Sequence, residues 1–150
     1  MSVNLGRSKI RNELARSARH DYLLFMDCDS GLVSDRYISN YLSEVAPDRV
    51  LYGGRTYRDT PPADPELFFH WKYGREREQS KPEEREKQPY HSFMTNNFLI
   101  PKALFLDICL DENLKQYGHE DTLFGLELRK RKIPIKHFDN PLEHLGPIAG

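Results

Sequence analysis

The chain alternates between segments with helical spacing of apolar residues and short apolar runs of strand length. Apolar residues recur at intervals of four behind Ser8, a residue type that often caps helices, and predict a helix over residues 8–19. Residues 22–26 then form an uninterrupted apolar run, which is typical of a strand covered on both faces in a mostly parallel sheet. The run ends in the polar sequence Asp-Cys-Asp-Ser-Gly.

The same kind of pattern predicts further helices and strands that alternate along the chain. Helices are expected at residues 35–45, 66–73, 102–108 and 120–132, and strands at residues 50–52, 98–100 and 133–138. This alternation indicates the α/β class. Gly53 and Gly54 close the second strand, which suggests a bend or the close approach of another segment.

Residues 74–88 differ from the rest of the chain because they are almost wholly polar or charged. We interpret this stretch as a mobile surface loop. A solvated linker is the simpler explanation of such a charge run, and a specific partner site is the alternative.

Composition places the chain among soluble globular proteins. Its 150 residues fit a single domain over residues 1–150, with 38% hydrophobic and 30% charged residues. The 22 basic and 23 acidic residues give a net charge of −1, so no global field attracts nucleic acid or anionic lipid. Any binding of phosphate must therefore be local, and no nucleic-acid partner is expected.

Cysteine usage and hydropathy indicate a cytoplasmic protein. The two cysteines, Cys28 and Cys109, form no Cys-x-x-Cys pattern and are too few for a disulfide framework, which favours a reducing compartment. No apolar run reaches the ~20 residues that a membrane span needs. We expect no transmembrane segment, while peripheral association with a membrane stays open.

The strongest candidate for chemistry is Asp27-Cys28-Asp29, at the end of the first apolar run. Two adjacent carboxylates repel each other unless a cation joins them, and a divalent metal with oxygen ligands would satisfy both. The carboxyl end of a buried strand is also where open α/β sheets bind ligands. The alternative is a simple turn, because Asp, Ser and Gly are turn residues and the Asp-x-Asp pattern is short and common.

Two later features add to this candidate site. Gly118-His119-Glu120-Asp121 puts an acidic pair at a predicted helix N-terminus, where Asp121 could act as a general base or the pair could merely cap the helix. His144 offers an imidazole nitrogen, a common ligand of Mn²⁺ and other transition metals, although a lone histidine near a terminus is more often a surface residue.

Taken in order, these motifs resemble the family 2 glycosyltransferases of the GT-A fold. The resemblance rests on four segments: Asn4-x-Gly6-Arg7-Ser8-x-x-Arg11-Asn12, residues 22–26 with Asp27-x-Asp29, Gly118-His119-Glu120-Asp121, and His144. It extends over nearly the whole chain, and the ordered set is more specific than any one motif.

The resemblance implies a metal-dependent, inverting transfer of a sugar from a nucleoside-diphosphate sugar to the hydroxyl of a glycan or lipid-linked acceptor. It also implies a GT-A-like mixed sheet flanked by helices and a divalent cation, Mn²⁺ or Mg²⁺. The resemblance implies that Asp29 and His144 bind the metal and that Asp27 lies near the ribose or the metal. It implies that Arg11 contacts the nucleotide and that Asn97 lines the donor-sugar pocket. It further implies that Glu120 positions the acceptor and that Asp121 is the catalytic base.

The chain departs from the family at its amino terminus. The motif that begins at residue 4 normally follows a first β-α-β-α-β unit that forms most of the nucleotide pocket, so the resemblance implies a fold truncated at the N-terminus. Loss of those strands would expose a sheet edge. We therefore expect either a homodimer, or another chain, that covers this edge, or a poorly stable monomer.

Two other functions stay open from the residues alone. Residues 24–30 also resemble the nucleophile strand of haloacid-dehalogenase-like phosphatases, with Asp27 as nucleophile, although Ser30 stands where threonine or valine is usual. The second alternative is a glycosyltransferase remnant that keeps the fold without transfer activity.

Overall fold

The computed structural model describes residues 6–113 and 119–146. The helices are α1 (Arg7–Ser17), α2 (Tyr37–Leu42), α3 (Pro65–Tyr73), the π-helical turn η1 (Gly74–Glu78), α4 (Pro82–Arg85), α5 (Lys102–Ile108) and α6 (His119–Lys130). The strands are β1 (Tyr22–Met26), β2 (Ser30–Leu32), β3 (Val50–Tyr52), β4 (Arg55–Thr56), β5 (Asn97–Pro101), β6 (Ile135–His137) and β7 (Leu142–His144). Asn4 and Gly118, which contribute to the resemblance, lie outside the described residues.

The main sheet has the strand order β1-β5-β3-β6 and mixes both directions of pairing. Strand β5 runs antiparallel to both β1 and β3, while β3 and β6 are parallel. The predicted α/β class and mixed sheet are confirmed, but the expectation that β1 lies in a mostly parallel sheet is wrong. An apolar run reports that both faces of a strand are covered, not the direction of its neighbour.

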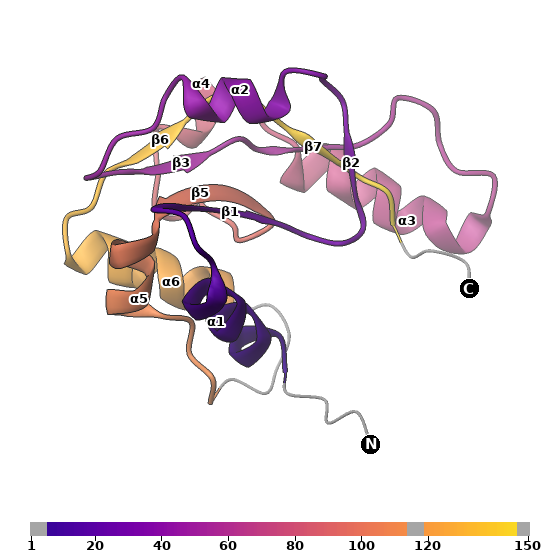
Figure 1. The fold of residues 1–150 in the computed structure, drawn as a ribbon. Helices are drawn as coiled ribbons and strands as arrows, with labels where there is room; N and C mark the ends of the chain where they lie inside the picture. Colours follow the sequence, from indigo (N-terminus) through magenta and orange to yellow (C-terminus); the bar gives the residue numbers. More distant parts are fainter. Residues whose placement is uncertain (1–5, 114–118, 147–150) are drawn as a thin grey trace.

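Both faces of this sheet are indeed covered (Figure 1). On one face, Leu23 and Phe25 of β1 pack into the larger hydrophobic cluster, together with residues of α1, α5 and α6. On the other face, Tyr22 and Leu24 pack against a smaller cluster that includes Tyr41 of α2. The alternation of neighbouring β1 side chains between two apolar clusters explains why the strand carries no polar residue.

A second sheet, with the order β2-β7-β4, extends from the end of β1. Its strands have only two or three residues each, and β2 is paired antiparallel with β7 so that Ser30 lies opposite His144. The sequence pattern did not predict these strands, because two or three residues are too few to show alternation. This sheet connects the residues after β1 to the last described segment of the chain.

The segment 74–88, expected to be a loop, contains η1 and α4. Its best-anchored residue is Arg85, which is buried and donates hydrogen bonds to His137 Nδ1 at 3.1 Å and to the Phe138 carbonyl at 2.9 Å. A charge run usually indicates a solvated segment, but here Arg85 is buried and bonded to residues distant in sequence. The solvated-linker interpretation therefore does not apply to Arg85.

Gly53 allows the close approach that its position suggested. A Cβ atom added there would lie 2.3 Å from the Asn140 carbonyl oxygen, a distance that side chains do not tolerate. The Gly53 carbonyl accepts a hydrogen bond from the Asn140 amide at 3.0 Å. Glycine at this position therefore lets the chain between β6 and β7 pack directly against the end of β3.

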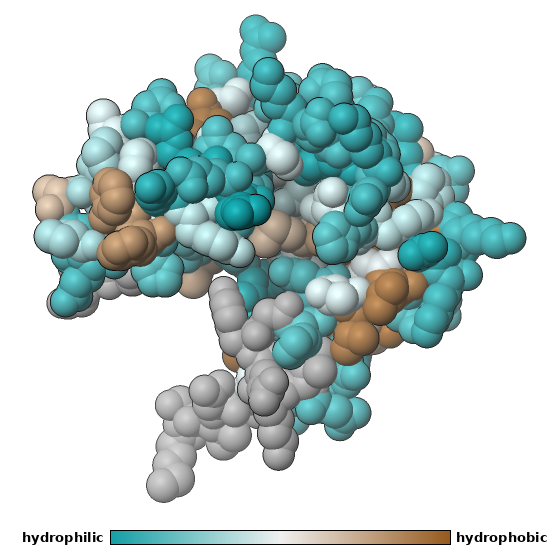
Figure 2. All heavy atoms as spheres, turned by 180° about the vertical axis from the view of Figure 1, so that it is seen from behind, coloured by the Kyte–Doolittle hydropathy of each residue, from teal (hydrophilic) through white to brown (hydrophobic). Residues whose placement is uncertain are grey.

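The surface seen in Figure 2 is mostly hydrophilic, with a few patches of apolar side chains, one of them on the side where α3 lies. Among residues 6–113 and 119–146, no helix combines the length and the hydrophobicity that a membrane crossing requires.

Candidate functional site

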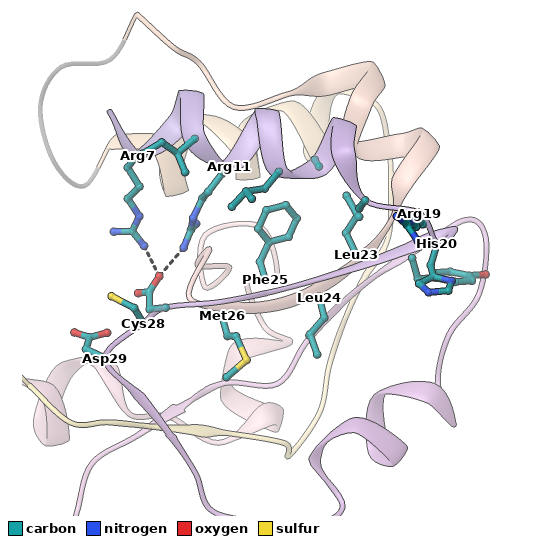
Figure 3. Close-up of a pocket in the computed structure, with 16 residues that line it drawn as sticks. Arg7, Arg11, Arg19, His20, Leu23, Leu24, Phe25, Met26, Cys28 and Asp29 are labelled. Atoms are coloured by element: carbon teal, nitrogen blue, oxygen red, sulfur yellow. Dashed lines mark hydrogen bonds and ion pairs between the residues drawn. The ribbon is translucent and has the colours of Figure 1, made fainter. Parts of the chain in front are cut away.

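The carboxylate of Asp27, directly after β1, is held by two arginines of α1. The Nη2 atoms of Arg7 and Arg11 each lie 2.5 Å from Asp27 Oδ1. The two arginines are one helical turn apart, so they leave α1 on the same side and converge on the end of β1 (Figure 3). Burial lowers the pKa of Arg11, and the charge of Arg7 acts in the same direction while Asp27 opposes it.

A third arginine, Arg55 of β4, approaches the same carboxylate from the second sheet. Its Nη2 atom lies 3.7 Å from Asp27 Oδ2, and its Nη1 atom donates a hydrogen bond of 2.7 Å to Glu78. Asp27 therefore compensates a cluster of guanidinium groups in a largely buried position. This arrangement differs from the expected role as a metal ligand, because cationic donors already occupy the carboxylate oxygen Oδ1.

Asp29 and His144 lie side by side. His144 Nδ1 is 3.5 Å from Asp29 Oδ2, and both side chains are partly open to solvent, 31% exposed for Asp29 and 26% for His144. Pairing of β2 with β7 produces this proximity, and the Leu145 amide donates a hydrogen bond of 2.9 Å to the Asp29 carbonyl. Oxygen and nitrogen ligands of one octahedral ion with ~2.1 Å bonds lie about 3 Å apart, so the pair fits two positions of such an ion.

Asp121 stands in the first turn of α6 and is connected to the segment before β5. Its Oδ1 atom accepts hydrogen bonds from the Thr95 backbone amide at 3.0 Å and from the Thr95 hydroxyl. Burial raises the pKa of Asp121, the Thr95 hydrogen bonds oppose the shift, and the neighbouring Glu120 carboxylate adds to it. A carboxylate with a raised pKa in a fixed position has the properties of a general base.

Hydrogen bonds and ion pairs join this carboxylate to the arginine cluster. Arg11 Nη1 donates a hydrogen bond of 2.9 Å to the Thr95 carbonyl, whose residue also holds Asp121. Glu120 is buried, and its Oε1 atom lies 3.7 Å from Arg7 Nε. The structure thus brings Asp27, Glu120 and Asp121 into one network around the first two turns of α1.

Asn97 differs from the other predicted site residues because its side chain is fully buried among protein groups. Its Oδ1 atom accepts hydrogen bonds of 2.6 Å from the hydroxyls of Tyr37 and Tyr41. Its Nδ2 atom donates to the carbonyls of Gly54 and Asn140. Its side-chain polar atoms are already paired and hold β5 to the neighbouring segments, and a place for Asn97 in a donor-sugar pocket stays a prediction.

The sequence patterns assigned no role to Arg55, Glu78 or Thr95. Arg55 follows the Gly53-Gly54 bend, and that position at a strand end is the one signal that could have indicated it. Glu78 lies in the charge run and Thr95 in an ordinary loop, so neither stands out among residues of the same type.

Two cavities meet at Asp29. The larger, of about 890 Å³, lies between α1 and β1 and is lined by Arg7 and Arg11, by Asp27 and by apolar side chains such as Leu14. The smaller, of about 440 Å³, lies between α3 and the second sheet and also has Asp29 in its wall. A ligand that reaches Asp29 through either cavity would therefore lie near the Asp29–His144 pair and near arginines of the cluster around Asp27.

No family model and no curated protein sequence matches the chain. Within residues 6–113 and 119–146, no three His, Cys, Asp or Glu side chains form a group that could hold a metal ion by themselves. A cation shared by Asp29 and His144 would take its remaining ligands from a bound anion and water.

Proposed function

We propose that this chain is a metal-dependent glycosyltransferase that moves a sugar from a nucleoside-diphosphate donor to an acceptor hydroxyl. The observation that carries the proposal is the Asp29–His144 pair. Asp29 is two residues from Asp27 and its arginine cluster, and Arg11 of that cluster contacts Thr95, which also holds Asp121, a carboxylate with a raised pKa. These three parts supply what such a transfer needs: a place for a cation, positive charge for a diphosphate, and a base. The order of the motifs in the sequence supports the same reaction.

The arginines of α1 would bind the diphosphate of the donor. Guanidinium groups form charge-assisted, often paired hydrogen bonds with phosphate oxygens. Arg7 and Arg11 already converge on one carboxylate oxygen of Asp27, so a phosphate at the mouth of the larger cavity would find two donors in place. In this scheme Asp27 orients the arginines.

Asp121 would accept the proton of the acceptor hydroxyl. The acceptor oxygen forms a bond to the anomeric carbon as the bond from that carbon to the donor's phosphate oxygen breaks, and the bonding electrons leave with the nucleoside diphosphate. The charges balance because the base gains one proton and the leaving group gains one negative charge. Single displacement inverts the anomeric configuration.

Asp29 and His144 would hold the divalent cation, for which their 3.5 Å separation and partial exposure are suited. The cation would supply Lewis-acid stabilisation of the charge on the departing diphosphate.

Calorimetric titration with uridine diphosphate, with and without Mn²⁺, tests the proposal. We expect binding that depends on Mn²⁺ in the parent chain and loss of that dependence in Asp29→Ala. Asp48→Ala is the matched control, because Asp48 is an exposed aspartate in the loop after α2. Binding that is equal with and without the metal, or unchanged in Asp29→Ala, would contradict the metal assignment.

The phosphatase alternative is less compatible with the site. It needs Asp27 as a nucleophile, yet two guanidinium groups hold Asp27 Oδ1 at 2.5 Å and lower the availability of its electrons. A burst of phosphate from p-nitrophenyl phosphate that disappears in Asp27→Asn would restore this alternative. Metal-dependent nucleotide binding without any sugar transfer would instead favour the non-catalytic remnant.

A further inference from the structure

The smaller cavity is lined by residues of α3 and of the sheet β2-β7-β4, with Asp29 in its wall. Figure 1 shows α3 beside the strands of this sheet. None of the sequence motifs includes the residues of α3 or η1 that form one of its walls. Its volume of about 440 Å³ is of the size that small-molecule sites have. The proposed donor site borders this cavity at Asp29, His144 and Arg55, while the rest of the cavity has no role in donor binding.

Helix α3 presents an aromatic wall to this cavity. Leu67, His70 and Trp71 are spaced at i, i+3 and i+4, and therefore lie on the face that lines the cavity. Although α3 has two phenylalanines, a tryptophan and a tyrosine, none of its residues is buried. An amphipathic helix normally buries such a face in the core, so the aromatic character of α3 has no explanation in the packing of the described residues.

The aromatic wall is anchored by contacts with neighbouring segments of the chain. Trp71 Nε1 donates a hydrogen bond of 2.8 Å to the Arg58 carbonyl, and the Arg75 guanidinium lies 5.3 Å from the Trp71 ring centroid. The ring of Tyr57 packs against the backbone of Gly74, where an added Cβ would lie 2.1 Å from the ring. Preorganised aromatic side chains of this kind lose little entropy when a ligand binds.

The opposite wall carries hydrogen-bonding groups. Glu78 accepts hydrogen bonds from Arg55 and from the Tyr57 hydroxyl, and these three groups form one edge of the cavity. The hydrogen bonds from Tyr57 and Arg55 outweigh the effect of burial and lower the pKa of Glu78, so the carboxylate is an acceptor. Asp29 and His144 complete the wall on the side of the proposed reaction centre.

We propose that this cavity binds the acceptor saccharide of the transfer reaction, an inference that rests on the proposed function. A sugar ring has one face of weakly polarised C–H groups, which is attracted to the negative face of an aromatic ring, and a rim of hydroxyls that both donate and accept hydrogen bonds. The cavity offers both kinds of partner on opposite walls. Because Asp29 also lines the larger cavity, a saccharide bound here would lie against the proposed donor site.

The single tryptophan of the chain, Trp71, makes this cavity directly observable. We would titrate the protein with methyl glycosides of glucose, galactose, mannose, N-acetylglucosamine and glucuronic acid. The readout is the intensity and position of tryptophan emission, at a fixed concentration of uridine diphosphate and Mn²⁺. Glycerol serves as a polyol without a ring. We expect at least one glycoside to change the emission saturably and glycerol to leave it unchanged.

Two exposed aromatics of α3, one turn apart, provide matched variants. Tyr73 lines the cavity and is 60% exposed, whereas Phe69 is 77% exposed and does not line it. Truncation of either should leave the fold intact. Tyr73→Ala should weaken saccharide binding roughly two- to tenfold, the effect of losing one aromatic contact, and Phe69→Ala should not change it.

The outcomes separate this inference from the proposed function. Absence of a saturable response to every glycoside, or equal weakening in both variants, would overturn the saccharide site while metal-dependent nucleotide binding persists. Loss of uridine diphosphate binding in Tyr73→Ala would also overturn it, because the cavity would then belong to the donor. A saccharide response in a protein that does not bind the nucleotide would leave the cavity a sugar site and refute the transfer reaction.

Discussion

His144 Nδ1 lies 3.5 Å from Asp29 Oδ2, although the two residues are far apart in the sequence. The pairing of β2 with β7, which sets Ser30 opposite His144, produces this contact without help from either side chain. The backbone therefore holds the two groups at a fixed separation, and a change to one side chain need not move the other.

The first prediction concerns the contribution of His144. We expect His144→Ala to weaken the Mn²⁺-dependent binding of uridine diphosphate by roughly tenfold or more, because removal of one ligand weakens the cation's hold on the anion. Glu143→Ala is the control, since the neighbouring residue of β7 carries its side chain on the other face of the strand. Calorimetry measures both variants, and an equal loss in the two would indicate damage to β7 instead of a lost ligand.

The second prediction concerns Asp27, whose loss should destabilise the fold. Asp27→Ala leaves three arginines without their common counter-charge, and Arg11 among them is buried. We expect the free energy of unfolding to fall by about 2 kcal/mol in urea denaturation. Inorganic phosphate should restore part of this loss by binding among the arginines and should stabilise the parent less. A variant as stable as the parent would show that the ion pairs contribute nothing.

The third prediction follows from the raised pKa of Asp121, which burial causes. As pH rises above the ordinary value of 3.8, the unfolded chain releases this proton before the folded chain does, so ionisation of Asp121 lowers stability. Asp121→Asn should therefore raise the melting temperature at neutral pH while abolishing transfer. The gain should disappear well below pH 3.8, where the carboxyl is protonated in both states.

Asp48→Asn, at an exposed position, is the comparison for this pH series. It should show no gain in melting temperature at any pH. If Asp121→Asn were less stable than the parent at neutral pH, the hydrogen bonds from Thr95 would outweigh the cost of burying the charge, contrary to the direction of the pKa shift.

The extent to which the sequence predicted this fold depends on the length of each element. The helices α1, α2, α3, α5 and α6 and the strands β1, β3 and β5 were expected close to where they lie, because their apolar residues follow a period over several residues or form a run. The short η1 and α4 were not expected, because their segment is almost wholly polar. The last strand was expected at residues 133–138 and covers only Ile135–His137. Pro134, directly before it, cannot donate a ladder hydrogen bond because it has no amide hydrogen, although its carbonyl accepts a hydrogen bond from the Val50 amide.

The candidate site was only partly predictable, for a different reason. Acidic residues at the ends of strands and helices could be selected from the sequence, as with Asp27 and Asp121. Their partners could not, because Arg55 and Thr95 reach the site through strand pairing and loop packing between segments far apart in the chain. Asn97 shows the reverse, since the family resemblance implied a ligand contact and the partners of its side chain are two tyrosine hydroxyls and two carbonyls.

The fourth prediction concerns His137, a buried histidine beside Arg85. Arg85 Nε donates to His137 Nδ1, so the neutral ring carries its proton on Nε2, which lies 2.9 Å from the Pro89 carbonyl. Burial and the charge of Arg85 lower the pKa of His137, with the Pro89 contact opposing them. Below about pH 6.5 the unfolded chain takes up this proton first, so stability should fall as the solution is acidified.

His137→Gln tests this, because a glutamine amide can accept from Arg85 and donate to the Pro89 carbonyl without titrating. We expect the melting temperature of the parent to decrease between pH 7 and pH 5 more steeply than that of the variant. Parallel curves would show that protonation of another group controls the acid sensitivity.

The last prediction concerns the open edge of the main sheet at β1. In the described part of the chain, β1 has β5 as its only neighbour. Asp21 and Asp27 make their backbone hydrogen bonds toward β5, so in this antiparallel ladder Tyr22, Leu24 and Met26 direct their amides and carbonyls toward the open side. Leu14 of α1 lies beside this edge in the wall of the larger cavity and is also exposed.

A strand with one open edge next to exposed apolar side chains favours association with a second copy of the chain. Met26→Lys, at a position that is 43% exposed, should block such pairing and shift the sedimentation profile toward monomer. Leu42→Lys on α2, where the parent side chain is 60% exposed, should leave association unchanged. A parent chain that sediments as a monodisperse monomer and melts at high temperature would contradict the prediction, because the open edge would then neither cause association nor lower stability.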